Sequence, residues 1–290
     1  MNQLNVRQIL ADHRLAPNKQ LGQNFLIQPR ITEQIVELAG ISPSDTVVEL
    51  GVGLGALTAP LAARAGRVIG LELDAGIVKY HQKALDLPAN VQLIHQDLLK
   101  ADFSAMAAQQ GQKLKIIANL PYSVTNPLLF KLLEYHRDLE WAVLMIQKEV
   151  AERLTAKPNG KEYGVLTVLL GTCATVERLL MVGPGNFYPR PKVDSVVIRI
   201  RFNVPEAAGA GTAADLTLMR RVVDAAFGQR RKTLLNSLGS GKLPGLGRAE
   251  AARALEAAAI SPSLRAENLT TADYLRLTGI IGELTKRSDV

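Results

Sequence analysis

Between residues 46 and 146 the chain alternates short apolar runs with longer amphipathic stretches. The short runs are rich in β-branched residues and predict buried strands, whereas the amphipathic stretches have apolar residues at helical spacing. The predicted strands are 46–50, 67–73, 91–94, 115–119 and 142–146, and the predicted helices are 56–66, 74–86 and 126–137. A repeated order of strand and helix is typical of a doubly wound, mostly parallel sheet, so we expect an α/β fold.

The pattern changes in the second half of the chain. Residues 163–176 predict a helix that runs into a strand, and the alternation in 194–202 predicts a late edge strand. Residues 203–215 are small and poor in large apolar side chains, which is typical of a linker. Helical stretches follow at 216–227, 249–260 and 271–284. We therefore expect two domains: an α/β domain with a basic N-terminal segment over 1–205, and a small all-α domain over 206–290.

Composition limits the class of protein. The 290 residues are 47% hydrophobic, which favours a folded core, and the net charge of +7 favours a polyanionic partner. Cys173 is the only cysteine, so an internal disulfide and a thiolate metal cluster are both excluded, and a reducing cytoplasm fits best. The chain has no apolar run of membrane-spanning length and no apolar signal-peptide segment. We expect no membrane association and no metal.

A glycine-rich turn follows the first predicted strand. In "VVELGVGLGALT" the strand leads through Gly51, Gly53 and Gly55 into a helix, and glycines let a backbone approach a ligand closely. The spacing G-x-G-x-G departs from the dinucleotide fingerprint, and a tight turn without a ligand is the simpler alternative. Glu72 ends the second strand, where ribose hydroxyls bind, and Asp97 follows the third, where a carboxylate can accept from an adenine amine. This order of features favours a nucleoside cofactor, and NAD remains an alternative.

A second unusual sequence, Asn119-Leu120-Pro121-Tyr122, ends the fourth predicted strand. Asn and Pro often mark a plain turn. The alternative is a site that methylates the exocyclic amine of adenine, a poor nucleophile because its lone pair is delocalised into the ring. The side-chain oxygen of Asn119 and the carbonyl of Leu120 could accept both amine protons, while Pro121 fixes the turn and Tyr122 stacks on the base. Catalysis would then come from positioning and a preorganised polar site.

Motifs along nearly the whole chain resemble those of the small-subunit ribosomal RNA adenine dimethyltransferases, the KsgA/RsmA family. They occur in the family's order: "LGQNFL" at 21–26, "VELGVGLGALT" at 48–58, "LELD" at 71–74, "QD" at 96–97, "NLPY" at 119–122, "QKEVAERL" at 147–154, "NFYPRPKVDSVV" at 186–197 and "FGQRRKTLLNSL" at 227–238. Any one of these is modest evidence, and together they are strong. The resemblance implies a Rossmann-like methyltransferase domain that uses S-adenosylmethionine, followed by a helical domain that binds RNA.

The resemblance also implies roles for single residues. Asn24, Leu26 and Gly51 would lie along the methionine end of the cofactor, with Gly53 in the same loop. Glu72 would hold the ribose, Asp97 the adenine, and Asn119 would join the cofactor and target sites. Phe187 would face the target base opposite Tyr122, although a core aromatic is the simpler interpretation of an isolated Phe. Arg230, Arg231 and Lys232 match the family's RNA-contacting segment, with the charges facing outward beside an apolar run.

The resemblance implies that the protein dimethylates N6 of two adjacent adenosines in the 3′-terminal hairpin loop of 16S ribosomal RNA. The expected partner is the small ribosomal subunit, where a role in biogenesis is expected too, and the expected state is a cytoplasmic monomer. The closest alternative is the Erm group, which methylates a large-subunit adenine; "FGQRRKTLLNSL" and the long helical C-terminus favour the first family. A NAD-dependent oxidoreductase would leave "NLPY" unexplained. An assembly factor that acts mainly by binding would not need Asn119, Glu72 and the glycines.

Overall fold

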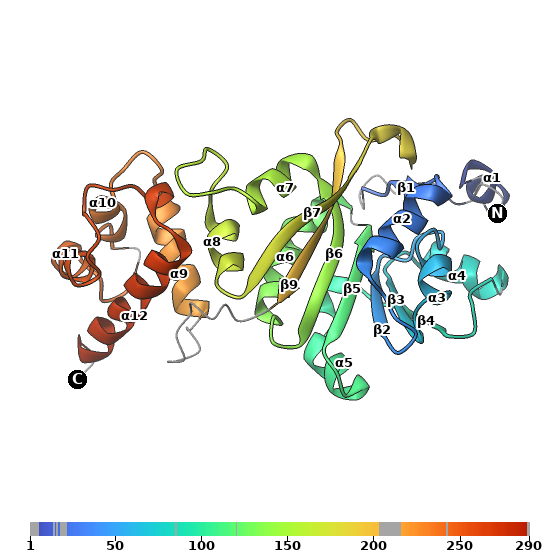
Figure 1. Cartoon of the computed structure of the whole chain (residues 1–290), viewed down its shortest axis with the longest axis horizontal. Coiled ribbons are helices and arrows are strands. Elements are labelled where there is room, and N and C mark those ends of the chain that lie inside the picture. The colour runs from blue at the N-terminus through green and yellow to red at the C-terminus, as the bar shows by residue number, and fades with distance from the viewer. Residues whose placement is uncertain are drawn as a thin grey trace. The chain divides into compact units, whose positions relative to one another are not determined.

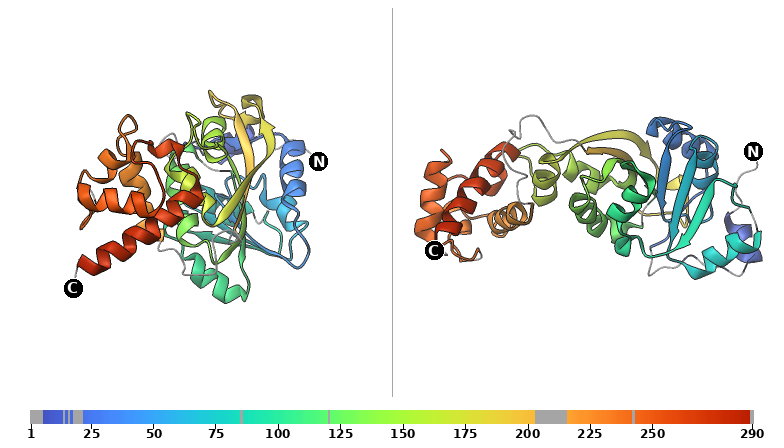
Figure 2. Two further views of the ribbon diagram at one scale, coloured as in Figure 1. Left: turned by 60° about the vertical axis from the view of Figure 1, so that its left-hand side comes forward. Right: turned by 90° about the horizontal axis from the view of Figure 1, so that it is seen from below.

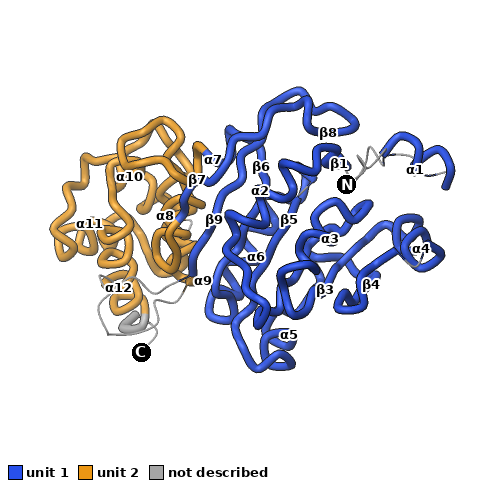
Figure 3. The backbone as a smooth tube through the Cα atoms, turned by 45° about the vertical axis from the view of Figure 1, so that its right-hand side comes forward, with its two compact units in different colours: residues 1–151, 176–202 blue, residues 152–175, 203–290 orange. Residues whose placement is uncertain are grey.

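The chain forms two compact units, each built from two separate segments of the sequence (Figure 3). The computed structural model describes residues 6–13, 15, 17, 22–84, 86–119, 121–202, 216–241 and 243–288. The first unit holds residues 1–151 and 176–202, and the second holds 152–175 and 203–290. The predicted linker at 203–215, and with it the expected division between residues 205 and 206, lies outside the described residues.

A seven-stranded sheet in the order β4-β3-β2-β5-β6-β9-β7 forms the centre of the first unit (Figure 1). The strands from β4 to β6 pair in parallel, and β9 pairs antiparallel with β6. The elements described for this unit are α1 (Val6–Asp12), β1 (Phe25–Leu26), α2 (Pro29–Ala39), β2 (Thr46–Leu50), α3 (Thr58–Ala62), β3 (Arg67–Glu72), α4 (Ala75–Ala84), β4 (Val91–His95), α5 (Phe103–Gln110), β5 (Leu114–Asn119), α6 (Thr125–Glu134), β6 (Leu139–Gln147), α7 (Lys148–Leu154), β7 (Ala174–Val182), β8 (Phe187–Tyr188) and β9 (Ser195–Phe202).

The alternating pattern of 194–202 predicts an edge strand, and this prediction is wrong. This strand, β9, lies between β6 and β7. Its arginines give it the appearance of a half-exposed strand, but Arg199 and Arg201 both pair with Glu177 of β7, at 3.2 Å and 3.6 Å. The charged positions of β9 are therefore partnered by the true edge strand.

Helices lie on both faces of the sheet (Figure 2), and its middle strands are buried, as in a doubly wound sheet. Neighbouring residues of a strand point to opposite faces, and Val47 and Val48 of β2 are both fully buried. On one face Val47 packs in a cluster with Ile35 of α2 and Leu61 of α3. This packing fixes the carboxyl ends of β2, β3, β4 and β5, where the loops carry the candidate chemistry.

The second unit is helical. Its elements are α8 (Val165–Gly171), α9 (Leu216–Phe227), α10 (Leu234–Leu238), α11 (Arg248–Ala257) and α12 (Thr271–Ser288), with the end of α7 and the start of β7 also assigned to it. Tyr274 of α12 is fully buried and its hydroxyl donates to Ala266 O at 2.9 Å. Among the described residues, no helix combines the length and apolar character needed to cross a membrane.

Candidate functional site

Segments far apart in sequence meet at the carboxyl end of the sheet. The two-residue strand β1 pairs antiparallel with β8, which sets Leu26 opposite Phe187 and Phe25 opposite Tyr188. Asn119, at the end of β5, donates through Nδ2 to the carbonyl oxygen of Asn24 at 3.2 Å. The fold thus joins "LGQNFL" with "NFYP" and with "NLPY". The order of strands reverses between β2 and β5, the place where open α/β sheets bind ligands.

The glycine loop needs its glycines. Gly51, Gly53 and Gly55 have φ of 80°, 55° and 80°, in the left-handed region that favours glycine. The amide of Gly51 donates to Leu71 O at 2.8 Å, which anchors the loop to β3. The loop therefore presents backbone rather than side chains between the ends of β2 and α3.

Glu72 is oriented by backbone amides. Its Oε2 accepts from Gly53 N and its Oε1 from Asp74 N, each at 2.8 Å. The side chain is buried, and burial raises the pKa of this carboxyl while the two amides oppose the change. Glu72 and the glycine loop are thus one hydrogen-bonded assembly, and each carboxylate oxygen keeps lone pairs for a ligand.

One cleft of about 210 Å³ collects the predicted cofactor residues. The predicted residues that line it are Asn24, Leu26, Gly51, Gly53, Glu72, Asp97, Asn119 and Pro121. Asp97 accepts from Leu99 N through Oδ1 at 2.9 Å, which holds the carboxylate at the start of a short 3₁₀ turn. Leu73 and Leu98 add apolar walls. The cleft combines fixed carboxylates with flat apolar surfaces, as a nucleoside requires.

A third acid in this cleft, Glu49, has no role in the sequence prediction. It lies in β2, is 1% exposed, and its Oε2 has no hydrogen-bond partner within the described residues. Burial raises the pKa of Glu49 to about 8, and the charge of Glu72 adds to the change. The available sequence signal is a carboxylate inside an otherwise apolar strand.

No role for His81 was predicted from the sequence either. It belongs to α4, is 2% exposed, and places Nε2 2.8 Å from Gly53 O and Nδ1 2.9 Å from Asp86 Oδ1. The sequence signal is a polar residue four positions after Ile77, on the buried side of an amphipathic helix. His81 thus contacts the glycine loop at Gly53, the residue whose amide donates to Glu72.

The predicted target-site residues are differently placed. Tyr122 is half-buried, does not line the cleft, and its hydroxyl lies 3.1 Å from Ser195 Oγ at the start of β9. Phe187 is 4% exposed and packs in the core cluster with Leu26, so it does not present an open ring face here. Leu120 lies outside the described residues. Base stacking by Tyr122 and Phe187 stays a prediction.

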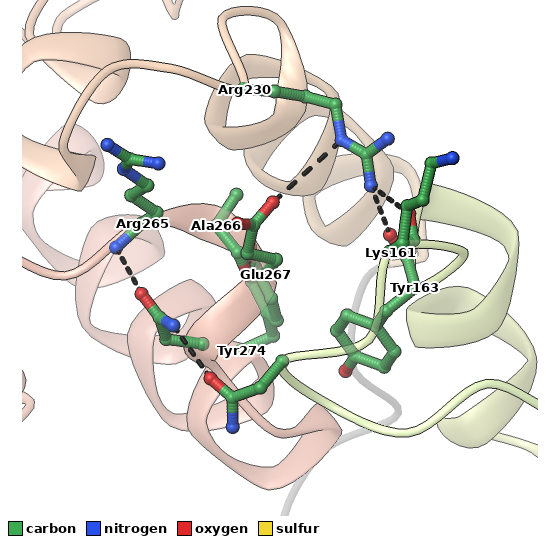
Figure 4. Close-up of polar contacts among 9 residues, drawn as sticks. Lys161, Tyr163, Arg230, Arg265, Ala266, Glu267 and Tyr274 are labelled. Atoms are coloured by element: carbon green, nitrogen blue, oxygen red, sulfur yellow. Dashed lines mark hydrogen bonds and ion pairs between the residues drawn. The ribbon is translucent and has the colours of Figure 1, made fainter.

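The three adjacent cations of the second unit have different surroundings, and Figure 4 shows those of Arg230. Arg230 donates to Lys161 O at 2.7 Å and Tyr163 O at 3.1 Å, and lies 3.9 Å from Glu267. Arg231 and Lys232 are exposed and have no side-chain partner among the described residues. All three lie in the turn between α9 and α10 rather than in a helix. RNA contact by the three cations stays a prediction. Arg230 also has a structural role, because its guanidinium binds two backbone carbonyls.

No group of three or more His, Cys, Asp or Glu side chains that could hold a metal ion is found in the described part of the chain.

Comparison with known sequences agrees with this geometry. The sequence model of "Ribosomal RNA adenine dimethylase" matches residues 14–283. The "Ribosomal RNA small subunit methyltransferase A" of Desulfotalea psychrophila is 45% identical over 97% of this chain and 96% of its own length. The protein of the same name from Clostridium botulinum strain Langeland is 40% identical over 97% of this chain and all of its own.

Two solved structures are similar over most of the chain. A dimethyladenosine transferase from Plasmodium falciparum has a TM-score of 0.71 at 27% identity, and the match covers 87% of this chain and 95% of that one. The 23S rRNA methyltransferase ErmE has a TM-score of 0.64 at 26% identity, with 89% and 99% covered.

Proposed function

Since the chain belongs to the ribosomal RNA adenine dimethylase family, we propose that it transfers two methyl groups to N6 of each of two adjacent adenosines in the 3′-terminal hairpin loop of 16S ribosomal RNA. The membership confirms the family expected from the motifs, and the α/β sheet with a helical second unit confirms the expected fold class. The observation that carries the proposal is the cleft, where Asn119 of "NLPY" and the glycine loop face one space.

S-adenosylmethionine fits the residues of the cleft. Among the residues that the structure describes, Glu49 Oε2 is buried without a hydrogen-bond partner, and a ligand with positively charged groups would supply one. Glu72 keeps lone pairs for ribose hydroxyls, Asp97 for an adenine amine, and Leu73 and Leu98 offer apolar surfaces to a base. When bound, S-adenosylmethionine supplies a methyl group on a positively charged sulfur. Asn24, Leu26, Gly51 and Gly53 line the same cleft and would hold the rest of the cofactor.

In this proposal Asn119 accepts a hydrogen bond from the target amine. Its Nδ2 is used by Asn24 O, which leaves Oδ1 as the free acceptor of the carboxamide. The carbonyl of Leu120 would accept the second amine proton. Two acceptors draw the nitrogen towards tetrahedral geometry and direct its lone pair at the methyl donor, so the chain needs no strong general base. The amine proton leaves to solvent after transfer.

Tyr122 supplies the stacking surface for the target base in this proposal. The contact of its hydroxyl with Ser195 Oγ holds the ring direction, and stacking on an aromatic side chain is worth about 1 to 3 kcal/mol. Phe187 faces the base only after a side-chain movement, because it is buried against Leu26 in the present conformation. Pro121 fixes the turn that leads from β5 to Tyr122 through its locked φ.

The proposed partner is the small ribosomal subunit. Arg231 and Lys232 project from the second unit without internal partners among the described residues, and phosphate contacts of this kind position a protein on RNA. We further propose that the protein works in the cytoplasm as a monomer and takes part in subunit biogenesis. Light scattering of the purified protein measures its molar mass, and the mass of an oligomer would contradict the proposed monomer.

The direct test incubates the protein with labelled S-adenosylmethionine and a mixture of unmethylated small and large ribosomal subunits, followed by separation of the two RNAs and nucleoside analysis. We expect label in N6,N6-dimethyladenosine from the small-subunit RNA. Label recovered only from large-subunit RNA would assign the protein to the activity that the name of ErmE describes. Label in no RNA would overturn the proposal.

A further inference from the structure

The peptide units around Gly53 are fixed from two sides. The amide of Gly53 donates to Glu72 Oε2 at 2.8 Å, and its carbonyl oxygen lies 2.8 Å from His81 Nε2. The ring of His81 also reaches Gly55, where an added Cβ would lie 3.4 Å from its Cε1. One imidazole from α4 therefore binds the loop at Gly53 and lies beside Gly55. These glycines occupy left-handed conformations and have no side chains of their own to hold them.

Both partners of the ring are hydrogen-bond acceptors. Gly53 O is a carbonyl oxygen and can only accept, so the hydrogen bond there is donated by His81 Nε2, while Nδ1 faces the carboxylate of Asp86. The side chain of His81 is 1% exposed, whereas that of Asp86 is 35% exposed. Asp86 thus stabilises a buried ring that donates to the loop, with one end of the pair in water.

We propose that His81 is a positioning residue of the cofactor site. It holds the Gly53 carbonyl, so that the amide of the same residue keeps Glu72 aimed at the ribose of S-adenosylmethionine. The inference rests on the proposed function, because it assigns His81 to the same cleft, but it adds a residue that touches neither cofactor nor RNA. A series of polar contacts, each 2.8 to 2.9 Å long, links Asp86 to His81, His81 to Gly53 and Gly53 to Glu72.

Two substitutions of His81 and one control test the proposal. His81→Leu removes both hydrogen bonds, and His81→Gln keeps an amide nitrogen that can donate to Gly53 O. The control is His136→Leu, because His136 also contacts a carbonyl, Leu133 O at 2.8 Å, at the end of α6 and outside the cleft lining. Binding of S-adenosylmethionine is measured by calorimetry, and KM and kcat are measured on unmethylated small subunits.

We expect His81→Leu to weaken S-adenosylmethionine binding about tenfold, the loss of roughly one hydrogen bond, while kcat at saturating cofactor changes less than about twofold. His81→Gln should recover most of the affinity, and His136→Leu should bind as wild type does. Wild-type affinity in His81→Leu, no recovery in His81→Gln, or an equal loss in His136→Leu would overturn the inference. If His81→Leu does not fold, the comparison of His81→Gln with wild type decides: an undiminished or slightly weakened affinity supports the proposal, and a tenfold loss overturns it. A wild-type protein that binds no S-adenosylmethionine would overturn the proposed function as well.

Discussion

Glu49→Gln should change how the stability of the first unit depends on pH. Burial raises the pKa of Glu49 to about 8 from 4.5, so the folded state binds this proton more tightly than the unfolded state. The stability contributed by the neutral carboxyl is fully present below about pH 4.5, is lost as pH rises, and is gone above about pH 8. At 1.36 kcal/mol for each pKa unit, the loss is roughly 5 kcal/mol in total. Gln has nearly the same shape and stays neutral.

The assay is urea unfolding between about pH 5 and about pH 9, followed by the fluorescence of Trp141. Trp141 is the only tryptophan, is 3% exposed, and belongs to the same unit as Glu49. We expect the free energy of unfolding of Glu49→Gln, relative to wild type, to rise by about 1.4 kcal/mol for each pH unit up to about pH 8.

The exposed Glu37 supplies the matched control, because Glu37→Gln should follow the wild-type pH dependence. Saturating S-adenosylmethionine should reduce the difference between wild type and Glu49→Gln, since a cation in the cleft favours the charged carboxylate. Parallel curves for wild type and Glu49→Gln would refute the reasoning and show that Glu49 is solvated or paired.

Three further predictions concern the other assigned residues. Arg230→Gln should lower the stability of the helical unit by about 1 to 2 kcal/mol, because it removes the contacts with Lys161 O and Tyr163 O, and thermal unfolding measures this. Neutralising Arg231 and Lys232 should leave stability within about 0.5 kcal/mol but flatten the salt dependence of subunit binding by roughly one unit of log–log slope per lost phosphate contact, and an unchanged slope would place the RNA surface elsewhere. Glu72→Ala should weaken S-adenosylmethionine binding in calorimetry by at least about tenfold, whereas Tyr122→Ala should mainly slow methyl transfer; tight cofactor binding by Glu72→Ala would mean that the site is misassigned.

Features set by local sequence were predictable. Strands β2 to β6 are apolar runs, and such runs indicate burial directly. The left-handed glycines and the acid that ends β3 are also local features, so the cleft could be outlined from the chain alone. Helix α2 is missing from the prediction although Ile31 and Ile35 have helical spacing, and the two-residue pairing of β1 with β8 is too short to leave a pattern.

Features set by distant partners were not predictable. The position of β9 depends on Glu177, which neutralises two arginines that otherwise indicate solvent. In the sequence Arg230 cannot be distinguished from the two cations that follow it. Only the fold shows that its guanidinium donates hydrogen bonds to carbonyls of the loop before α8. His81 likewise gains its role from a loop 28 residues away in sequence.

The helical unit, built from residues 152–175 and 203–290, has a consequence for how it can be made. Synthesis proceeds from the amino end, so α8 exists before α9, the helix against which it packs. Leu166, Leu169 and Leu170 of α8 are buried in the folded protein. During synthesis α9 is not yet available to cover these side chains while strands β7 and β9 are made. A fragment that starts at residue 203 would lack α8 and expose the side of α9 that α8 covers. The unit can be excised only as a spliced polypeptide, with residues 152–175 joined to 203–290 by a designed connection.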